Sequence, residues 1–210
     1  MLYIFDWDGT LVNSVARIVS SLKLAAHELS LPLLSDQQYQ EIIGLGLKEA
    51  VDHLYPGVDA TLQAAMRDAY SKHFVAADVA PCPFFEGVTE TLQQLLNDGH
   101  HLAVATGKSR RGLNRVLAQL DWQDYFHATR CADETASKPH PLMLEQILEQ
   151  LGYHPDEAVM VGDTAFDLEM AKNAGMRRVG VSYGAHPVSR LATSEPVAII
   201  DNFADLMRVV

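Results

Sequence analysis

Hydrophobic and polar positions follow two different periods along the chain, and the change between them divides the sequence into parts. Residues 2–5 form a short apolar run that stops at Asp6, which predicts a buried strand ending in a polar turn. From residue 13 to about residue 80, apolar residues recur at helical spacing and no segment has the pattern of a strand. This block is expected to form helices over residues 14–31, 35–43, 47–55 and 60–77.

Local signals set the expected ends of the first helices in this block. Asn13 or Ser14 is predicted to cap the first helix, which Pro32 closes. Ser35 followed by Gln38 is a capping box that opens the second helix. We therefore expect separate short helices here and not one long one.

Beyond Pro83 the pattern alternates between strands and helices. Alternation of this kind predicts a parallel sheet covered by helices on both faces. The chain is thus expected to have an α/β fold: a Rossmann-like parallel-sheet core of residues 1–12 and 84–210, with an all-helical block of residues 13–83 inserted after the first strand. Strands are expected at 101–105, 127–130, 159–161, 179–181 and 198–200, and helices at 87–97, 109–120, 140–151 and 165–174.

Composition narrows the class of protein. Of 210 residues, 48% are apolar and 20% are charged, which is typical of a soluble globular protein. A net charge of −11 argues against binding nucleic acid or an acidic membrane, and an anionic substrate would need local positive groups. Cys82 and Cys131 lack disulfide or metal spacing and are expected to be reduced thiols. With no signal-peptide pattern in MLYIFD and no membrane-length apolar run, we expect a cytoplasmic protein.

Polar residues follow the predicted strands at the edge where an open parallel sheet binds ligands. Any one of them alone is explained as a turn or helix-cap residue, or as a surface charge. Their coincidence at one edge of one sheet predicts a functional site. The candidates are Asp6, Asp8 and Gly9 after the first strand, Thr106 and Gly107 after the second, Lys138 before a helix, and Asp163 and Asp167 after a later strand.

This set of residue types indicates phosphoryl transfer assisted by a metal. Clustered carboxylates repel one another unless a cation lies among them, and oxygen ligands favour Mg²⁺. A carboxylate attacking phosphorus would form an aspartyl-phosphate, whose oxygens a lysine and the backbone N–H groups beside Gly9 and Gly107 would contact. Asp8 is placed to protonate the leaving group and then to deprotonate water.

The same segments resemble the four motifs of the haloacid dehalogenase superfamily. They are DWDGT, the threonine after the second strand, Lys138-Pro139, and GDTAFD, in that order over essentially the whole chain. The block at 13–83 is similar to the helical cap of that superfamily. Within it, the segment VGDTAFDLEMAKNAG is most similar to the phosphoglycolate-phosphatase-like branch.

The resemblance implies a role for each acidic residue. Asp6 would be the nucleophile and a Mg²⁺ ligand, and Asp8 the acid/base, with its backbone carbonyl on the metal. Asp163 would also ligate Mg²⁺. Asp167 would hold metal-bound waters or Lys138. The resemblance thus implies a magnesium-dependent hydrolase.

The resemblance also implies the substrate class. Thr106 and Lys138 would bind the phosphoryl group, and an aspartate at position 8 favours phosphate esters over halides and phosphonates. The expected partner is a small phosphorylated metabolite, either phosphoglycolate-like or a sugar phosphate, acted on by a monomer or homodimer. Phosphoglycolate phosphatases often carry Thr-Asn-Lys where this chain has Thr106-Gly107-Lys108, which weakens the assignment of phosphoglycolate itself.

Other functions remain open at this stage. A phosphosugar mutase would share the core and cap but would need a bisphosphate. A non-enzymatic binding protein on the same fold would typically lose a charged motif residue, and this chain keeps them. A receiver domain with a phosphorylated aspartate would need neither the helical insertion nor the paired aspartates.

Several residues are set aside or kept as weaker candidates. The nine histidines lack metal-ligand spacing and are expected to be surface or core residues. Arg110-Arg111 is expected to be a solvated helix start, the alternative being that the pair adds positive potential over the cleft. Gly44-Leu45-Gly46 breaks a helix and could let the cap contact substrate, with Lys48 as the candidate contact.

Overall fold

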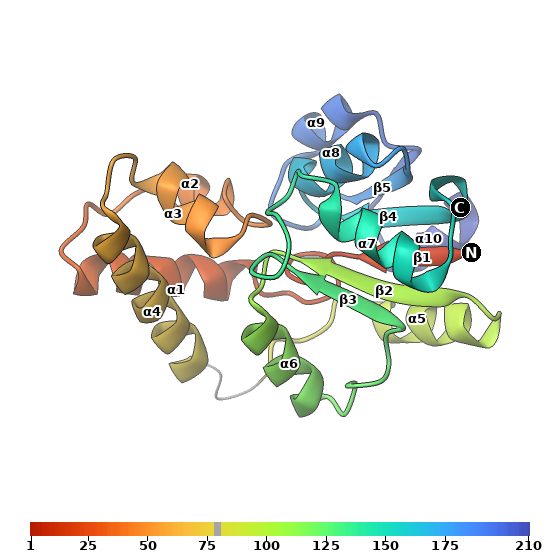
Figure 1. Cartoon of the computed structure of the whole chain (residues 1–210), viewed down its shortest axis with the longest axis horizontal. Coiled ribbons are helices and arrows are strands. Elements are labelled where there is room, and N and C mark those ends of the chain that lie inside the picture. Colours follow the sequence, from red (N-terminus) through yellow and green to blue (C-terminus); the bar gives the residue numbers. More distant parts are fainter. Residues whose placement is uncertain (78–80) are drawn as a thin grey trace.

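The computed structural model describes residues 1–77 and 81–210, and these form two lobes (Figure 1). The larger lobe contains one parallel sheet, whose six described strands have the order β3-β2-β1-β4-β5-β6. The predicted α/β fold with a parallel sheet is confirmed. The strands are β1 (Leu2–Phe5), β2 (His101–Thr106), β3 (Ala128–Cys131), β4 (Ala158–Gly162), β5 (Arg177–Val181) and β6 (Ala198–Ile200).

Helices cover both faces of this sheet. Successive side chains of each strand point to opposite faces, and the apolar side chains on each face pack against helices. In β1, Tyr3 and Phe5 pack in the hydrophobic cluster that includes residues of α5 and α6. Leu2 and Ile4 pack in the cluster on the other face, with residues of α7 and α8. These helices are α5 (Val88–Asn97), α6 (Arg110–Gln119), α7 (Leu142–Leu151) and α8 (Ala165–Asn173), and short α9 (Val188–Leu191) and α10 (Leu206–Val209) follow.

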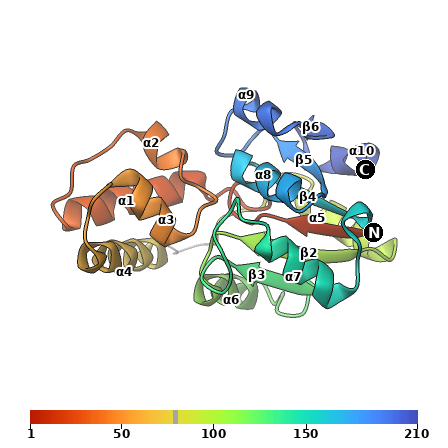
Figure 2. The same ribbon diagram turned by 45° about the horizontal axis from the view of Figure 1, so that its top comes forward.

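The smaller lobe is helical and has a hydrophobic core of its own (Figure 2). Leu22, Tyr39, Val51 and Met66 are among its fully buried members. The helices of this lobe bury their apolar faces against one another, and this explains why the sequence shows helical periodicity throughout the block. Its described helices are α1 (Val15–Glu28), α2 (Asp36–Gln40), α3 (Leu47–Leu54) and α4 (Ala60–Ala76).

Two chain segments connect the lobes, and they run side by side. The backbone N–H of Asn13 donates to the carbonyl of Pro83 at 2.9 Å, and that of Phe85 donates to the carbonyl of Leu11 at 3.0 Å. The expected boundaries at 12/13 and 83/84 lie at this paired connection. Residues 78–80 of the expected helical block lie outside the described residues.

Some helix ends differ from the predictions. α1 begins at Val15, but the Ser14 side chain does not cap it, because its hydroxyl donates to Asp8 instead. The capping box of Ser35 and Gln38 is confirmed. α2 ends at Gln40, earlier than predicted, and turns follow.

The helix predicted from residue 140 begins at Leu142, directly after a proline. Proline suits only the first turn of a helix.

In the part of the chain that the structure describes, no helix is both long and apolar enough to cross a membrane.

Candidate active site

Neighbouring strands β2, β1 and β4 end at one edge of the sheet and bring the predicted side chains together. Asp6 follows β1, Thr106 is the last residue of β2, and Asp163 follows β4. Lys138 comes from the connection between β3 and α7, and Asp167 from the first turn of α8. All five are at most 1% exposed. Charges this deeply buried require partners.

Lys138 joins two of the carboxylates. Its Nζ donates to Asp6 Oδ1 at 2.5 Å and to Asp167 Oδ1 at 2.6 Å. Burial lowers the pKa of the Lys138 ammonium, but Asp167 and Asp6 outweigh burial and raise that pKa above its ordinary value. The other oxygen of Asp167 accepts hydrogen bonds from the N–H and hydroxyl of Thr164. Asp167 therefore holds Lys138, as expected, and has both oxygens occupied.

Asp163 is fixed by hydrogen bonds and by close backbone packing. Its Oδ1 accepts from Thr10 Oγ1 at 2.9 Å and its Oδ2 from the N–H of Ala185 at 2.7 Å. A Cβ at Gly9 would lie 2.2 Å from Asp163 Oδ2, and one at Gly184 would lie 2.1 Å from Asp163 Cβ. A side chain at either position would collide with the Asp163 side chain, so the two glycines let the backbone pack closely against it.

The residues present fit a hard divalent cation. Asp6, Asp163 and Asp167 each offer an oxygen within 4.8 Å of the others. Asp6 Oδ2 is buried and has no hydrogen-bond partner among the described residues. Burial raises the pKa of Asp6 well above its usual range and that of Asp163 to about 7, so a cation beside them would favour the ionised form of both carboxylates at neutral pH. Asp6 and Asp163 are the better ligands, because, in the described part of the chain, Asp6 has an oxygen without a hydrogen-bond partner and Asp163 has only neutral donors, whereas Asp167 is paired with the Lys138 ammonium.

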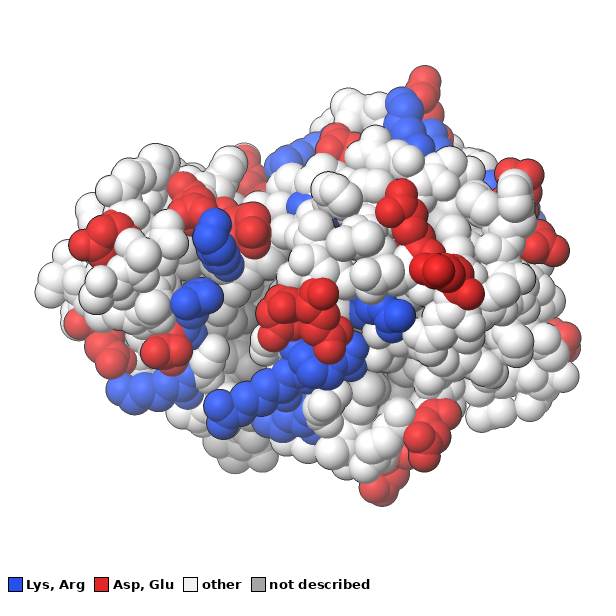
Figure 3. Space-filling model, viewed as in Figure 1, with Lys and Arg blue, Asp and Glu red and all other residues white. Residues whose placement is uncertain are grey.

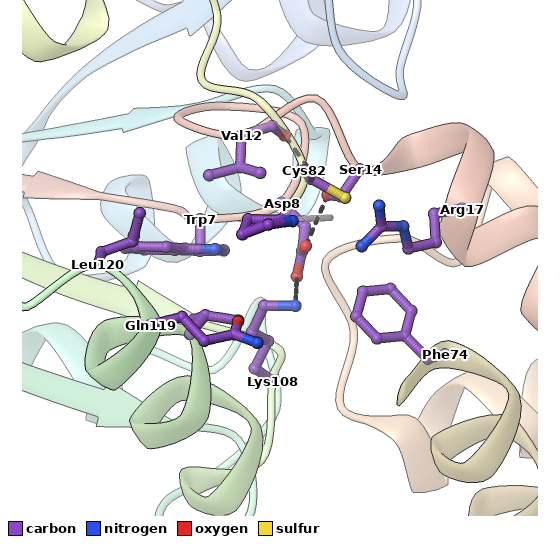
Figure 4. A pocket seen from close by; sticks show the side chains of 12 residues that line it. Trp7, Asp8, Val12, Ser14, Arg17, Phe74, Cys82, Lys108, Gln119 and Leu120 are labelled. Atoms are coloured by element: carbon purple, nitrogen blue, oxygen red, sulfur yellow. Dashed lines mark hydrogen bonds and ion pairs between the residues drawn. The ribbon is translucent and has the colours of Figure 1, made fainter. Parts of the chain in front are cut away.

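Asp8 is held apart from this cluster. Its Oδ1 accepts a hydrogen bond from Ser14 Oγ at 2.6 Å, and its Oδ2 lies 2.8 Å from Lys108 Nζ (Figure 4). The carboxylate is thus not one of the clustered metal-ligand candidates, and only its backbone carbonyl remains as the expected ligand. Sequence reasoning missed both partners, although Lys108 directly follows the predicted Thr106-Gly107.

Next to Asp8 lies a cavity of about 380 Å³, including space open to solvent, between the two lobes. Trp7 and Phe74 contribute aromatic walls (Figure 4). Lys108 Nζ lies 4.9 Å from the centre of the Phe74 ring, and the Arg17 guanidinium carbon lies 5.9 Å from it, both in cation–π range. Figure 3 shows further Lys and Arg side chains along the seam between the lobes, next to Asp and Glu side chains. These cations supply the local positive charge that a net charge of −11 makes necessary for an anionic substrate.

The two remaining predicted substrate-binding residues lie beside the cluster. Thr106 Oγ1 accepts a hydrogen bond from the N–H of Lys108 at 3.2 Å. Gly107 lies directly under the backbone of Gly44 and Leu45 from the helical lobe. The glycine break singled out in the sequence therefore does contact the catalytic edge.

The weaker candidates lie elsewhere. Lys48 is exposed and pairs with Asp52 at 3.3 Å, so the structure does not bring it to the cluster. Arg110 pairs with Glu134 at 2.7 Å and donates to Thr129 on the edge strand β3, which agrees with a surface role.

One histidine was undervalued. His186 is 2% exposed and connects the lobes: its Nδ1 accepts from the N–H of Ala165 at 3.0 Å, so Nε2 carries the hydrogen that points to the Glu41 carbonyl, 3.2 Å away. Its isolated position in the sequence gives no signal of this contact.

Known proteins are similar to this chain over nearly its whole length. Residues 3–181 match the family model described as haloacid dehalogenase-like hydrolase. The protein named "Probable phosphatase IndB" of Dickeya dadantii (strain 3937) is 37% identical over 98% of this chain and 91% of its own length. The "Phosphoglycolate phosphatase" of Pectobacterium atrosepticum is 31% identical over 98% of this chain and 90% of its own. A crystal structure titled as a predicted phosphoglycolate phosphatase from Haemophilus somnus 129pt has a TM-score of 0.84 at 26% identity, covering 99% of this chain and 96% of that one.

The chain combines a Rossmann-like parallel-sheet fold with a buried carboxylate–lysine cluster at the carboxyl edge of the sheet. The chain belongs to the haloacid dehalogenase-like hydrolase family. The predicted resemblance to its phosphoglycolate-phosphatase-like branch is confirmed, as is the predicted enzyme class, a phosphoric monoester hydrolase.

Proposed function

We propose that the chain is a Mg²⁺-dependent phosphatase that hydrolyses the phosphomonoester of a small metabolite through an aspartyl-phosphate on Asp6. The observation that carries this proposal is the Asp6 carboxylate: Lys138 holds one oxygen, and the other is buried without a hydrogen-bond partner among the described residues. An oxygen so placed is available to a metal or to phosphorus. The relatives named phosphoglycolate phosphatase support a phosphoglycolate-like or sugar phosphate substrate.

In the first step a carboxylate oxygen of Asp6 attacks phosphorus and forms the acyl-phosphate bond, while the bond from phosphorus to the ester oxygen breaks. The ester oxygen leaves with a proton from Asp8, which is thereby ionised. Lys138 stays hydrogen-bonded to Asp6 and Asp167, and its positive charge offsets the negative charge of the transferring phosphoryl group. The Thr106 hydroxyl would donate a hydrogen bond to a phosphoryl oxygen.

In the second step water attacks phosphorus and gives a proton to the ionised Asp8. The bond between phosphorus and the Asp6 oxygen breaks, which releases inorganic phosphate and restores the carboxylate. Asp8 ends the cycle protonated and ready for the next ester.

Asp6, Asp163 and the backbone carbonyl of Asp8 would hold Mg²⁺, with Asp167 in support. When bound, the metal supplies positive charge that lets an anionic phosphate approach an anionic nucleophile. Thr10 and Ala185 fix the Asp163 carboxylate that would hold it.

The helical lobe would serve as the cap, with residues 13–83 moving as a unit on the paired connection at Asn13 and Pro83. Closure of this kind excludes water from the reacting groups and typically takes microseconds to milliseconds. A pair of crystal structures, with and without a phosphate analogue, would show whether the lobe rotates as a rigid body. A lobe that stays fixed in both would contradict this role.

The function is tested by phosphate release from a panel of phosphorylated metabolites, with Mg²⁺ or with EDTA. We expect turnover that requires Mg²⁺ and is absent in Asp6→Asn, which keeps the size of the side chain but removes the attacking oxygen. Dependence on an added bisphosphate, with isomer in place of free phosphate as the product, would favour a phosphosugar mutase. No turnover of any ester by the folded, Mg²⁺-loaded chain would favour a binding protein.

A further inference from the structure

The ammonium group of Lys108 lies where the two lobes meet, and it contacts residues of both (Figure 4). On the core side, its Nζ lies 2.8 Å from Asp8 Oδ2. On the side of the helical lobe, it lies 4.9 Å from the centre of the Phe74 ring, within cation–π range. Lys108 comes after β2, Asp8 after β1, and Phe74 belongs to α4. Three segments that are distant in the sequence therefore meet at this one group.

Lys108 is held more firmly than a lysine on the protein surface. Exposed lysine side chains move among many conformations, which makes their ion pairs weak. The side chain of Lys108 is only 10% exposed. Its backbone is fixed as well, because its N–H donates to Thr106 Oγ1 at 3.2 Å and its carbonyl accepts from the N–H of Ala132 at 3.3 Å. A lysine held in this way can fix the carboxylate with which it pairs.

The Asp8 carboxylate has a partner at each of its two oxygens. Ser14 Oγ donates to Oδ1 at 2.6 Å, and the Lys108 ammonium faces Oδ2 (Figure 4). A carboxylate held through one oxygen can still turn about the bonds of its side chain, whereas one held through both oxygens has a single orientation. Lys108 is therefore the partner that completes the orientation of Asp8.

This orientation matters for the first step of the proposed reaction. Asp6 and Lys138 would hold the phosphoryl group at the edge of the sheet, and Asp8 lines the cavity between the lobes, where the leaving group has room. An acid must come within about 2.6–3.2 Å of the oxygen that it protonates. A misplacement of about 1 Å can cost about 100-fold in rate. Loss of the partner at Oδ2 would thus slow proton donation even though the acid itself is still present.

We propose that Lys108 is a positioning residue for the acid/base Asp8, and that Phe74 of the helical lobe holds the Lys108 ammonium in place. This inference rests on the proposed phosphatase function and adds two residues that act on the reaction through Asp8. The alternative role for Lys108 is direct binding of the phosphoryl group. Direct binding would affect every ester alike, whereas a role through Asp8 affects the first step only for esters whose leaving group needs a proton.

The test compares first-step rates for two esters of similar size: benzyl phosphate, whose alkoxide needs a proton to leave, and p-nitrophenyl phosphate, whose aryl oxide does not. Lys108→Met removes the ammonium but keeps an unbranched side chain and the backbone hydrogen bonds. It should lose about 10- to 100-fold with benzyl phosphate and less than about threefold with p-nitrophenyl phosphate. Rapid-quench analysis of benzyl alcohol and stopped-flow absorbance of p-nitrophenol measure the two rates.

A double-mutant cycle shows whether Lys108 acts through Asp8. In an Asp8→Asn background, Lys108→Met should change the benzyl phosphate rate by less than about threefold, because no acid is left to position. Lys172→Met is the matched control. Lys172 also pairs with a carboxylate, that of Glu195 at 2.7 Å, but it is exposed on α8 and does not line the cavity, so both rates should stay unchanged.

Phe74→Leu tests the second half of the proposal. Leucine keeps an apolar side chain in the core of the helical lobe but cannot attract a cation. The benzyl phosphate rate should fall by roughly two- to 30-fold, the factor for one cation–π interaction. The guanidinium carbons of Arg17 and Arg115 also lie 5.9 and 5.8 Å from the centre of this ring. Phe74→Leu is therefore repeated in the Lys108→Met background, where it should have less than about a twofold effect if it acts through Lys108.

The outcomes separate the inference from the function on which it rests. Equal losses with both esters in Lys108→Met, no loss with either, or a loss that persists in the Asp8→Asn background would overturn the inference and leave the phosphatase function standing. Wild-type enzyme that uses p-nitrophenyl phosphate but not benzyl phosphate would show that no acid assists the leaving group, which also overturns it. Wild-type enzyme that hydrolyses neither ester with Mg²⁺ overturns both. Phe74→Leu carries the test with the same two esters if Lys108→Met fails to fold.

Discussion

The buried carboxylates make the stability of the metal-free protein depend on pH in a direction that can be worked out. Burial raises the pKa of Asp163 to about 7, from an ordinary value of 3.8, and also raises that of Asp6. Between these values the folded protein holds a proton that the unfolded chain has released. The contribution that the Asp163 proton makes to stability is therefore fully present below pH 3.8 and is lost as pH rises through about 7.

The size of the effect follows from the same two values. A rise of about three pKa units at Asp163 corresponds to at most about 4 kcal/mol, at about 1.4 kcal/mol per unit. Asp6 adds to the loss in the same direction. Lys138 does not change charge in this range, because its pKa is raised from an already high value. Mg²⁺ competes with the proton for these carboxylates, so it should stabilise the protein far more at pH 8 than at pH 5.

Urea unfolding at pH 5, 6, 7 and 8, with EDTA or with Mg²⁺, measures this dependence. Asp163→Asn is the matched control: it keeps the size of the side chain, removes one titrating group, and should make the EDTA curve less steep while removing most of the Mg²⁺ effect. Histidines and surface acids titrate equally in both proteins, so the difference between them isolates Asp163. Parallel curves for the two proteins, or equal stabilisation by Mg²⁺ at pH 5 and pH 8, would show that the buried Asp163 carboxyl does not cause the pH dependence.

Three further predictions concern the reaction and its supporting charges. In the first step, Asp8→Asn should lose more rate with alkyl phosphates than with p-nitrophenyl phosphate, because the aryl oxide leaves without protonation. Stopped-flow absorbance measures these rates, and equal losses would show that Asp8 is not the acid. EDTA should abolish turnover, Mg²⁺ should restore it and Ca²⁺ should inhibit it, since the larger, more flexible shell of calcium misplaces the nucleophile; activity in metal-free buffer would contradict this. Lys138→Met should cost about 3–5 kcal/mol in metal-free urea unfolding at pH 8 by leaving the Asp6 and Asp167 charges unpaired, and a loss below about 1 kcal/mol would contradict the buried pairing.

The sequence was sufficient for the parts of the molecule that local patterns determine. Strands such as β1 and β4 are short runs buried on both sides, and an apolar run that ends at a polar residue is visible without coordinates. Because parallel strands end at one edge, the residues after them meet wherever the sheet forms. This is why Asp6, Thr106 and Asp163 could be grouped in advance.

The parts that depend on packing between distant segments could not be predicted. Ser14 has the right place and chemistry to cap α1, and only the position of Asp8 shows that its hydroxyl is used there instead. The ion pair of Lys108 depends on the path of the loop after β2. The packing of residues 41–46 on Gly107 and His186 depends on how two lobes with separate hydrophobic cores fit together, which no local pattern encodes.

The central claim, a covalent phosphoryl group on Asp6, is tested most directly by trapping it. Asp8→Asn should accumulate the aspartyl-phosphate, because water is no longer activated in the second step and general catalysis typically contributes about 10²–10⁴-fold. The variant is mixed with p-nitrophenyl phosphate and Mg²⁺, quenched in acid within milliseconds, digested and analysed by mass spectrometry. We expect one phosphoryl group, acid-stable and base-labile, on the N-terminal peptide at Asp6 and none in the matched Asp6→Asn, Asp8→Asn double variant. A phosphoryl group on another residue, or turnover with no phosphorylated peptide at any quench time, would contradict it.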